Sequence, residues 1–207
     1  MQSTTLKKKS NKPPLPVADK REAILRSAIK VFATNGYFNS KVSDVAREAR
    51  IADGTVYLYF KGKDDILHSI FDRAMAEFIA EGKREIAGIE SPVDRLTRIA
   101  ELHLEKLGAD RDLAVVFQVE LRGSIKFMRE FSGAGFAEYL DIIRHTIEEG
   151  QRSGDFRKDI KAVVAAKVIY GSLDEMVTNW VLSNRADPLG PLAAEVIKIY
   201  LGGILAK

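Results

Sequence analysis

Apolar residues recur at helical spacing along almost the whole chain. In the first such stretch, Leu25, Ala28, Ile29 and Phe32 follow one another at i, i+3, i+4 and i+7, which places them on one face of an α-helix. Runs with the period of two that is typical of strands are hard to find. The sequence therefore predicts an all-α fold of about nine helices, at residues 19–35, 42–49, 54–60, 63–88, 92–107, 110–121, 124–152, 159–184 and 188–206.

Residues typical of helix ends support these limits. Asp19 with Glu22 three positions later has the pattern of a capping box, and Asn35-Gly36 is a typical helix end. Ser91 before Pro92 indicates a helix start, and Asp187-Pro188 separates the last two predicted helices.

The charged residues are divided unevenly between two parts of the chain. The formal net charge is +3, yet residues 1–62 carry a net +7 and the remaining 145 residues a net −4. A basic head on an acidic body predicts a polyanionic partner for the head. Residues 1–18 are polar, basic and proline-containing, and we expect a disordered arm. It either adds phosphate contacts through Lys7, Lys8, Lys9 and Lys12 or is a solvated tail without a role.

Several classes of function are excluded or disfavoured by composition. The chain has no cysteine, so it has no disulfide, no thiol nucleophile and no cysteine-ligated metal. Its three histidines, His68, His103 and His145, lack metal-ligand spacing and are expected to be ordinary surface or core residues. No long apolar span and no apolar signal segment is found. We expect a cytoplasmic protein that is not an enzyme, holds neither metal nor cofactor and has no membrane partner.

Two short predicted helices have the dimensions of a DNA-reading helix-turn-helix. The first runs from Ser43 to Ala49 and the second from Gly54 to Phe60. The second is too short to be stable alone, so its apolar side must be braced by neighbouring helices while its polar side faces outward. Its outward positions, together with the two lysines that follow, suit phosphate oxygens: Thr55, Tyr57, Tyr59, Lys61 and Lys63.

This segment resembles the DNA-binding domain of the TetR family of repressors. The resemblance is carried by the stretches 42–46 and 51–63, with Asn35-Gly36-Tyr37 before them, and it spans about residues 20–67. It implies a DNA-binding domain over 19–65 and a ligand-binding and dimerisation domain over 66–207. It also implies backbone contacts to DNA from Thr55, Tyr57, Tyr59 and Lys63, and groove contacts from Ser43 and Gly54.

Two positions depart from the family's pattern. Arg50 stands where glycine is common, so a left-handed backbone there costs roughly 1 kcal/mol unless the turn has another geometry. Arg50 is also a candidate for a phosphate contact. Asp53 stands where Lys or Arg is frequent, and an acid facing DNA repels phosphate. We expect Asp53 to cap the third helix, with acceptance of a hydrogen bond from a cytosine amine as the alternative.

The predicted helices of the body are apolar on more than one face. Such helices need several neighbours, which indicates a ligand cavity, a second subunit or both. The last two helices suit a homodimer because Gly171, Ser172 and Gly202-Gly203 allow close approach. TetR-family proteins also dimerise through their last two helices, and a two-fold dimer is what reading a palindromic operator requires.

Segments 118–124 and 170–181 narrow the resemblance to the FadR-type repressors of fatty-acid degradation. The resemblance implies that long-chain acyl-CoA is the inducer, which releases the operator. Arg122, Lys126 and Arg129 have the spacing of one helical face and are candidates for the CoA phosphates, although such a face is commonly just solvated. Asn179 and Trp180 are candidates to line the pocket, with ordinary core as the alternative for Trp180.

Two other functions stay open at this point. One is a TetR-type repressor of an efflux or other operon whose inducer is an aromatic or hydrophobic small molecule. The other is a helical lipid carrier that does not bind DNA. An aromatic pocket would favour the first, and the absence of salt-dependent binding to duplex DNA would favour the second.

Overall fold

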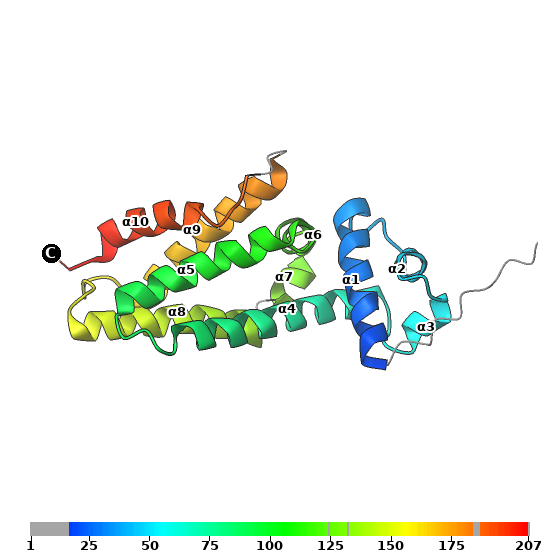
Figure 1. Cartoon of the computed structure of the whole chain (residues 1–207), viewed down its shortest axis with the longest axis horizontal. Coiled ribbons are helices and arrows are strands. Elements are labelled where there is room, and N and C mark those ends of the chain that lie inside the picture. The colour runs from blue at the N-terminus through cyan, green and yellow to red at the C-terminus, as the bar shows by residue number, and fades with distance from the viewer. Residues whose placement is uncertain (1–16, 124, 132, 184–186, 207) are drawn as a thin grey trace, which may run out of the picture.

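The computed structural model describes residues 17–123, 125–131, 133–183 and 187–206, and their regular elements are all helices (Figure 1). The all-α prediction is confirmed. The predicted arm lies mostly outside the described residues. The helices are α1 (Val17–Asn35), α2 (Val42–Glu48), α3 (Asp53–Tyr57), α4 (Lys63–Ile86), α5 (Pro92–Ala109), α6 (Arg111–Val115), the π-helix η1 (Val116–Glu120), α7 (Ile125–Phe131), α8 (Ala134–Ser153), α9 (Ala162–Leu182) and α10 (Leu192–Ile204).

Two of the predicted helices are divided in the structure, which explains why nine were expected and ten α-helices and a π-helix are found among the described residues. The segment predicted at 110–121 is α6 followed by η1, and the segment predicted at 124–152 is α7 followed by α8. Helix α1 begins at Val17, so Asp19 is its third residue and not its first, as the predicted limits required. With five residues, η1 is about one turn long, which is too short for the apolar pattern to distinguish it from an α-helix.

The N-terminal helices pack around one apolar cluster, which we call the reader cluster. The stripe predicted from the sequence is confirmed, because Leu25, Ala28 and Phe32 are fully buried in it. Three buried members, Val116, Leu121 and Phe127, come from η1, the turn after it and α7. The complete set of buried members is Ile24, Leu25, Ala28, Val31, Phe32, Tyr37, Val45, Ala46, Val56, Phe60, Ile66, Leu67, Ile70, Phe71, Val116, Leu121 and Phe127.

Helix α4 connects the reader cluster to a second cluster, the body core, built from α4, α5, α6, α8, α9 and α10. The first half of α4 buries Ile66 and Ile70 in the reader cluster, and the second half buries Ile79 in the body core. With 24 residues, α4 is about 36 Å long. It runs from α1–α3 at one end of the molecule along the elongated body (Figure 1). No helix in the described ranges is long and apolar enough to cross a membrane.

Candidate DNA-binding and ligand-binding sites

The helix-turn-helix exposes most of the residues predicted to meet DNA. Val45, Ala46 and Val56 are fully buried, and burial of these positions turns the opposite sides of α2 and α3 toward solvent. Tyr57 is 58% exposed. The other predicted residues of this surface are exposed (Arg50, Asp53, Gly54 and Lys61) or half-buried (Ser43, Thr55 and Tyr59).

Arg50 adopts the left-handed conformation that glycine favours. Its φ is 57°, and it is the one non-glycine residue with positive φ in the described chain. The N–H of Arg50 donates to Arg47 O at 3.1 Å and the N–H of Ile51 donates to Ala46 O at 3.0 Å, which together form a Schellman ending for α2. Of the two possibilities raised by the sequence, the strained turn is the one found, and it directs Arg50 outward.

Asp53 does not cap α3, contrary to expectation. The helix begins one residue earlier than predicted, so that Ala52 is the N-cap and Asp53 the first helical residue, and no side chain makes a capping hydrogen bond there. Asp53 still lies in the first turn, where its carboxylate interacts favourably with the positive end of the helix dipole.

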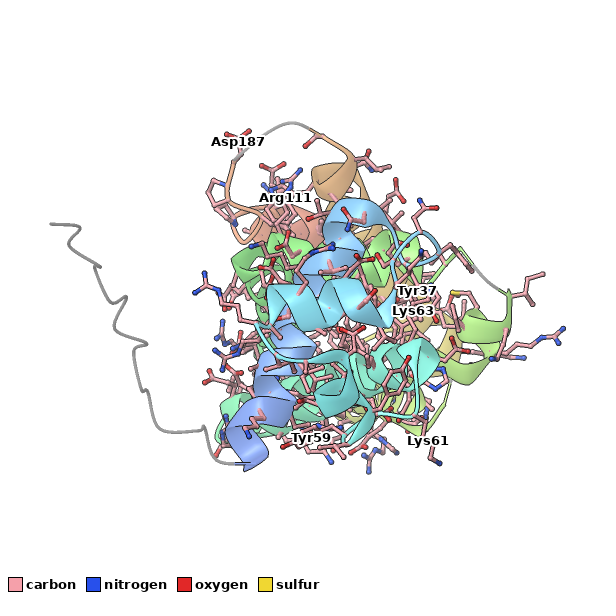
Figure 2. All side chains as sticks on the ribbon, turned by 90° about the vertical axis from the view of Figure 1, so that its right-hand side faces the viewer. Tyr37, Tyr59, Lys61, Lys63, Arg111 and Asp187 are labelled. Carbon is pink, nitrogen blue, oxygen red and sulfur yellow. The ribbon has the colours of Figure 1, made fainter. Side chains whose placement is uncertain are left out.

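Lys63 departs from its predicted role at a phosphate. Its ammonium donates to three carbonyls of the loop between α1 and α2, those of Tyr37 (2.7 Å), Ser40 (2.9 Å) and Phe38 (3.3 Å), and lies 4.3 Å from the centre of the Tyr37 ring. Figure 2 shows Tyr37 and Lys63 side by side, with Lys61 lying apart at the periphery. Burial lowers the pKa of Lys63. In this conformation Lys63 closes the loop and is not presented to DNA.

The same loop is held by residues of the body. The Tyr37 N–H donates to Glu120 Oε2 at 2.6 Å, and Glu120 is the last residue of η1. The Tyr37 hydroxyl donates to Asp64, whose other carboxylate oxygen accepts from Lys126 at 3.0 Å. These bonds, the Tyr37 bond first, hold the pKa of Asp64 below its usual range. The DNA-reading unit is therefore hydrogen-bonded to the π-helix through Glu120 and to α7 through Lys126.

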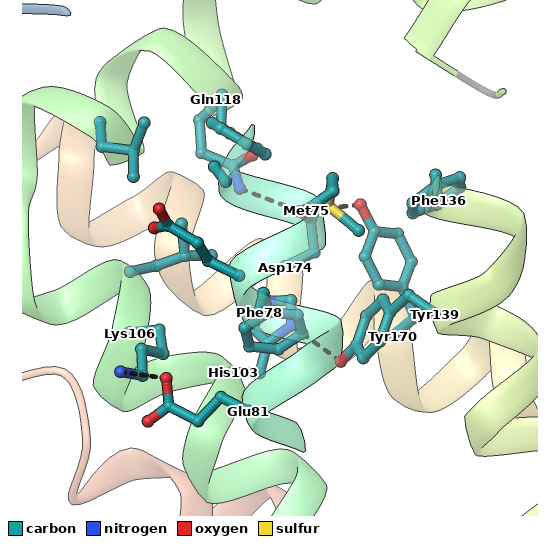
Figure 3. Close-up of a pocket in the computed structure, with 15 residues that line it drawn as sticks. Met75, Phe78, Glu81, His103, Lys106, Gln118, Phe136, Tyr139, Tyr170 and Asp174 are labelled. Carbon is teal, nitrogen blue, oxygen red and sulfur yellow. Dashed lines mark hydrogen bonds and ion pairs between the residues drawn. The ribbon is translucent and has the colours of Figure 1, made fainter. Parts of the chain in front are cut away.

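The body contains a cavity of about 160 Å³ between α4, α5, α6, α8, α9 and η1 (Figure 3). Its walls are largely aromatic and apolar, from Met75, Phe78, Leu107, Leu113, Phe117, Phe136, Tyr139 and Tyr170. A second, open groove of about 840 Å³ lies between α4, α7 and α8, and Met75 and Phe136 line both spaces. The groove therefore adjoins the cavity at these two side chains.

A buried carboxylate stands in the cavity wall. Asp174 is 8% exposed, and its oxygens accept from Gln118 Nε2 at 2.9 Å, from the Tyr170 hydroxyl at 3.2 Å and from Arg122. The Thr178 hydroxyl donates to the remaining Gln118 oxygen at 3.0 Å. A buried charge is tolerated only where hydrogen-bond donors and a countercharge surround it. Asp174 on α9 finds one of these donors, Gln118, on η1, so the network joins the two helices.

His103 also faces the cavity. It is 4% exposed, and its Nδ1 lies 3.0 Å from the Tyr139 hydroxyl. Burial lowers its pKa to about 4, so the ring is neutral near pH 7.

The three basic residues predicted to share a helical face do not share one. Arg122 lies in the turn before α7, and its guanidinium, although partly exposed, pairs with the buried Asp174. Lys126 and Arg129 are on α7, exposed, with Lys126 directed to Asp64. The break between η1 and α7 removes the continuous helix that the i, i+4, i+7 spacing assumed.

Asn179 and Trp180 do not line the cavity, contrary to prediction. Asn179 is exposed, and its amide donates to the Glu175 carbonyl at 3.1 Å. Trp180 is half-buried, its indole N–H donates to the Asp187 carbonyl at 2.8 Å, and the guanidinium carbon of Arg111 lies 4.6 Å from its ring. Trp180 packs against the body core, which is the alternative that the sequence left open.

The residues that do line the cavity were missed by sequence reasoning. His103 was assigned an ordinary surface or core role because no metal-ligand spacing pointed to it. The sequence did contain a signal for a buried role of Asp174. This carboxylate follows Leu173 and precedes Val177 by three positions, so it lies within the apolar face of its helix. An acid there needs buried partners. No group of His, Asp or Glu that suits a metal ion occurs in the described part of the chain.

The fold and these sites define a helix-turn-helix regulator whose helical body holds an apolar cavity. Residues 24–70 match the model of the TetR family of bacterial regulatory proteins, and residues 71–203 match that of the YsiA-like protein C-terminal region. The chain belongs to the TetR family of bacterial regulatory proteins.

Its relatives are transcriptional regulators and not enzymes. The chain is 36% identical over 184 residues to the fatty acid metabolism regulator protein of Bacillus subtilis, which covers 89% of this chain and 95% of that protein. The structure of the fatty acid degradation regulator FadR from Bacillus halodurans superimposes with a TM-score of 0.85 at 34% identity, covering 95% and 98% of the two chains. FadR from Bacillus subtilis in complex with stearoyl-CoA superimposes with a TM-score of 0.83 at 34% identity, covering 88% and 98%.

Proposed function

We propose that the protein is a repressor of fatty-acid degradation genes that binds a palindromic operator as a homodimer and is released by long-chain acyl-CoA. The observation that carries this proposal is the likeness, over 88% of the chain, to a regulator that was solved with stearoyl-CoA bound. The apolar cavity with its adjoining groove supports it, because it offers separate surroundings for an acyl chain and for a polar head group. Its place of action is the cytoplasm, where the DNA is.

The operator contacts belong to the exposed side of α2 and α3. Arg50, Lys61 and Tyr57 supply cations and a hydroxyl for phosphates, and Gly54 has open space where a Cβ would stand, which permits close approach to a groove. Lys63 supports this surface indirectly by holding the loop before α2.

The homodimer uses α9 and α10, which lie side by side along one edge of the body (Figure 1). Their outer face is apolar and hollowed, with a groove of about 580 Å³ that includes Val168, 54% exposed, and Ile199, 79% exposed. A Cβ added at Gly171 or Gly202 would meet nothing within 4 Å, so a second copy can approach closely there. A large exposed apolar patch of this kind is typical of an interface. Two recognition helices then meet half-sites about 34–36 Å apart.

Effector binding must widen the body. Ligand pockets that enclose drug-sized molecules have volumes of about 300–1,000 Å³, and the cavity has only about 160 Å³. A long acyl chain therefore has to move Met75 and Phe136, and with them α4 and α8, as it enters from the groove. Near the groove, Lys83 in its wall and Lys126 and Arg129 on α7 are exposed cations that can meet CoA phosphates.

Two elements couple this change to the reading unit. Helix α4 passes from the cavity wall into the reader cluster, and η1 places Phe117 and Gln118 in the cavity wall two to three residues before Glu120. Glu120 holds the loop before α2 through Tyr37. An effector that prefers the displaced arrangement weakens operator binding by its difference in affinity for the two states.

A binding assay with the DNA upstream of the protein's own gene tests the proposal. We expect operator affinity to fall steeply with salt and to be lost on addition of oleoyl-CoA, but not of free CoA or oleic acid. Lys61→Ala should weaken binding to specific and unrelated DNA alike, whereas Lys158→Ala, the same change on the body, should not. Retained DNA binding at saturating acyl-CoA would refute the inducer while leaving the repressor intact.

The aromatic character of the cavity favours a second candidate, a repressor that responds to an aromatic small molecule. Phe78, Phe117, Phe136, Tyr139 and Tyr170 all line it, and such rings suit a flat ligand. Under this alternative a panel of aromatic compounds releases the operator and CoA thioesters do not, so the same assay separates the two.

A further inference from the structure

The polar side chains around the cavity are almost all satisfied within the protein. Asp174 receives hydrogen bonds from Gln118, Tyr170 and Arg122, and the Gln118 oxygen receives one from Thr178. At the rim, Lys106 pairs with Glu81 at 2.6 Å. The network therefore has its own donors and does not require a ligand to complete it.

One buried atom of this wall is different. Nε2 of His103 is the buried polar side-chain atom without a hydrogen-bond partner among the described residues that line the cavity. No hydrogen bond joins it to Asp174, whose carboxylate accepts from Gln118, Tyr170 and Arg122. Buried polar atoms in proteins nearly always have a partner, so an orphan atom at a cavity wall points to the ligand.

The chemistry of the missing partner follows from the proton on the ring. Tyr139 bonds to His103 Nδ1. If Nδ1 carried the proton, both the Tyr139 hydroxyl proton and Nε2 would lack a partner. If instead Tyr139 donates to Nδ1, only the Nε2 proton is left, and this arrangement satisfies more atoms. Nε2 is then a donor, and the partner is an acceptor.

The surroundings decide what kind of acceptor fits. The ring centres of Phe78, Tyr139 and Tyr170 lie 6.1, 5.9 and 6.0 Å from that of His103, so aromatic rings surround the imidazole, while the polar groups Asp174 and Gln118 of the same wall are bonded to each other (Figure 3). Because burial holds the ring neutral, with a pKa of about 4, it offers no countercharge to a carboxylate or a phosphate. With charged acceptors excluded, the acceptor that fits is a neutral oxygen beside an apolar chain.

We infer that the Nε2–H of His103 binds a neutral oxygen of the effector inside the cavity, which makes His103 a specificity-determining residue. This inference rests on the proposed function. Two oxygens of an acyl-CoA have the required chemistry: the thioester carbonyl, and a hydroxyl or keto oxygen carried by the acyl chain. Each lies beside apolar carbon atoms and is uncharged.

Calorimetric titrations with three ligands of equal chain length separate these sources. They are a saturated acyl-CoA, its S-alkyl-CoA thioether, in which CH₂ replaces the carbonyl, and the 3-hydroxyacyl-CoA. Each is titrated into the wild-type dimer, His103→Phe, which removes the donor, and His103→Gln, which keeps an N–H near the position of Nε2. Ratios of affinities within one protein are compared, so a general loss of affinity in a variant does not affect the result.

We expect wild type and His103→Gln to prefer one oxygen-bearing ligand by about tenfold, the usual value of one neutral hydrogen bond, and His103→Phe to lose that preference. Preference for thioester over thioether assigns the carbonyl, and preference for the hydroxyacyl ligand assigns the chain oxygen. Absence of any preference in wild type, or the same preference in His103→Phe, would overturn the inference and leave the repressor function standing. Failure of all three CoA ligands to bind wild type would refute the proposed effector and the inference with it.

Discussion

The reader cluster and the body core are packed on different principles. At the centre of the reader cluster, Leu25, Phe32, Val45 and Val56 are all 0% exposed and apolar, so the cluster is a filled core around the helix-turn-helix. The body core borders a cavity, and the cavity wall contains a buried carboxylate and a neutral histidine. A core without open space resists deformation, whereas a core beside a cavity has room to rearrange, which suits a DNA-binding unit and a ligand-binding unit respectively.

The two regions meet at the π-helix. A π-turn leaves part of the α-helical hydrogen-bond ladder unmade, and such turns are frequent at functional sites. Here η1 places Gln118 in the network of the cavity and Glu120 on the loop of the reader. A deformable element thus lies between a rigid region and an adaptable one.

The largest effect is expected when an aromatic ring is removed from each region. Phe32→Ala should lower the free energy of unfolding by about 3–5 kcal/mol, because it leaves a cavity in a filled core. Phe136→Ala, at a wall that already borders open space, should lower it by about 1 kcal/mol and broaden the range of effectors. Chemical denaturation measures both, and equal losses would show that the body core is as tightly packed as the reader cluster.

The second test uses pH. In the folded protein His103 stays neutral down to its pKa of about 4, whereas in the unfolded chain it is protonated below about 6.5. The unfolded state therefore binds more protons between these values, and stability falls as pH falls from 6.5 to 4, by about 3 kcal/mol from this residue.

The His103→Gln variant has no imidazole to protonate, so it does not lose this stability as pH falls. Its free energy of unfolding, compared with that of wild type, should therefore rise as pH falls from 6.5 to 4. The lowered pKa of Asp64 changes the free energy of unfolding only at pH values near or below the usual pKa of a carboxyl group. Asp64 in the reader therefore adds little to the pH dependence of stability between pH 6.5 and pH 5. Urea denaturation at pH 7, 5.5 and 4.5 measures the difference, and a constant difference across these values would contradict the buried neutral histidine.

The third test removes a hydrogen bond between the two regions. Glu120→Ala removes the acceptor of the Tyr37 N–H, which should lower the free energy of unfolding by about 1.5–2 kcal/mol, as for a hydrogen bond to a charged group. It should also reduce the effect of acyl-CoA on operator affinity. Glu120→Gln, which keeps an acceptor oxygen, and the exposed Asp159→Ala are the controls. Unchanged coupling in Glu120→Ala would leave α4 as the sole connection.

The smallest test acts on the backbone of the reader. Arg50→Gly relieves a left-handed residue and should raise the free energy of unfolding by up to about 1 kcal/mol, while DNA affinity falls and the dependence of log K on log salt becomes shallower by about one. Gly36→Ala, at φ 79°, should lower stability by a similar amount. A stabilised Arg50→Gly with unchanged DNA affinity would remove Arg50 from the phosphate contacts.

Local patterns predicted much of the fold and of the reader. The stripe of α1, the ends at Asn35-Gly36 and at Ser91-Pro92, and the exposed side of α3 all depend on neighbours within about one helical turn. The site of the ligand was predicted less well. Arg122 was grouped with Lys126 and Arg129 from spacing alone, yet the chain leaves the helix between them and Arg122 turns inward to Asp174.

By itself the sequence determined the helical class, the helix-turn-helix and the family, because periodicity, caps and turn residues are local properties that the chain carries wherever it folds. Only the tertiary structure decided where Lys63 points, which residues face the cavity and that His103 Nε2 lacks a partner. These depend on residues that are far apart in the chain, such as Lys63 and Tyr37, 26 positions apart, or His103 and Tyr139, 36 positions apart. Such pairs form only when packing brings distant helices together, and no spacing along the chain encodes them.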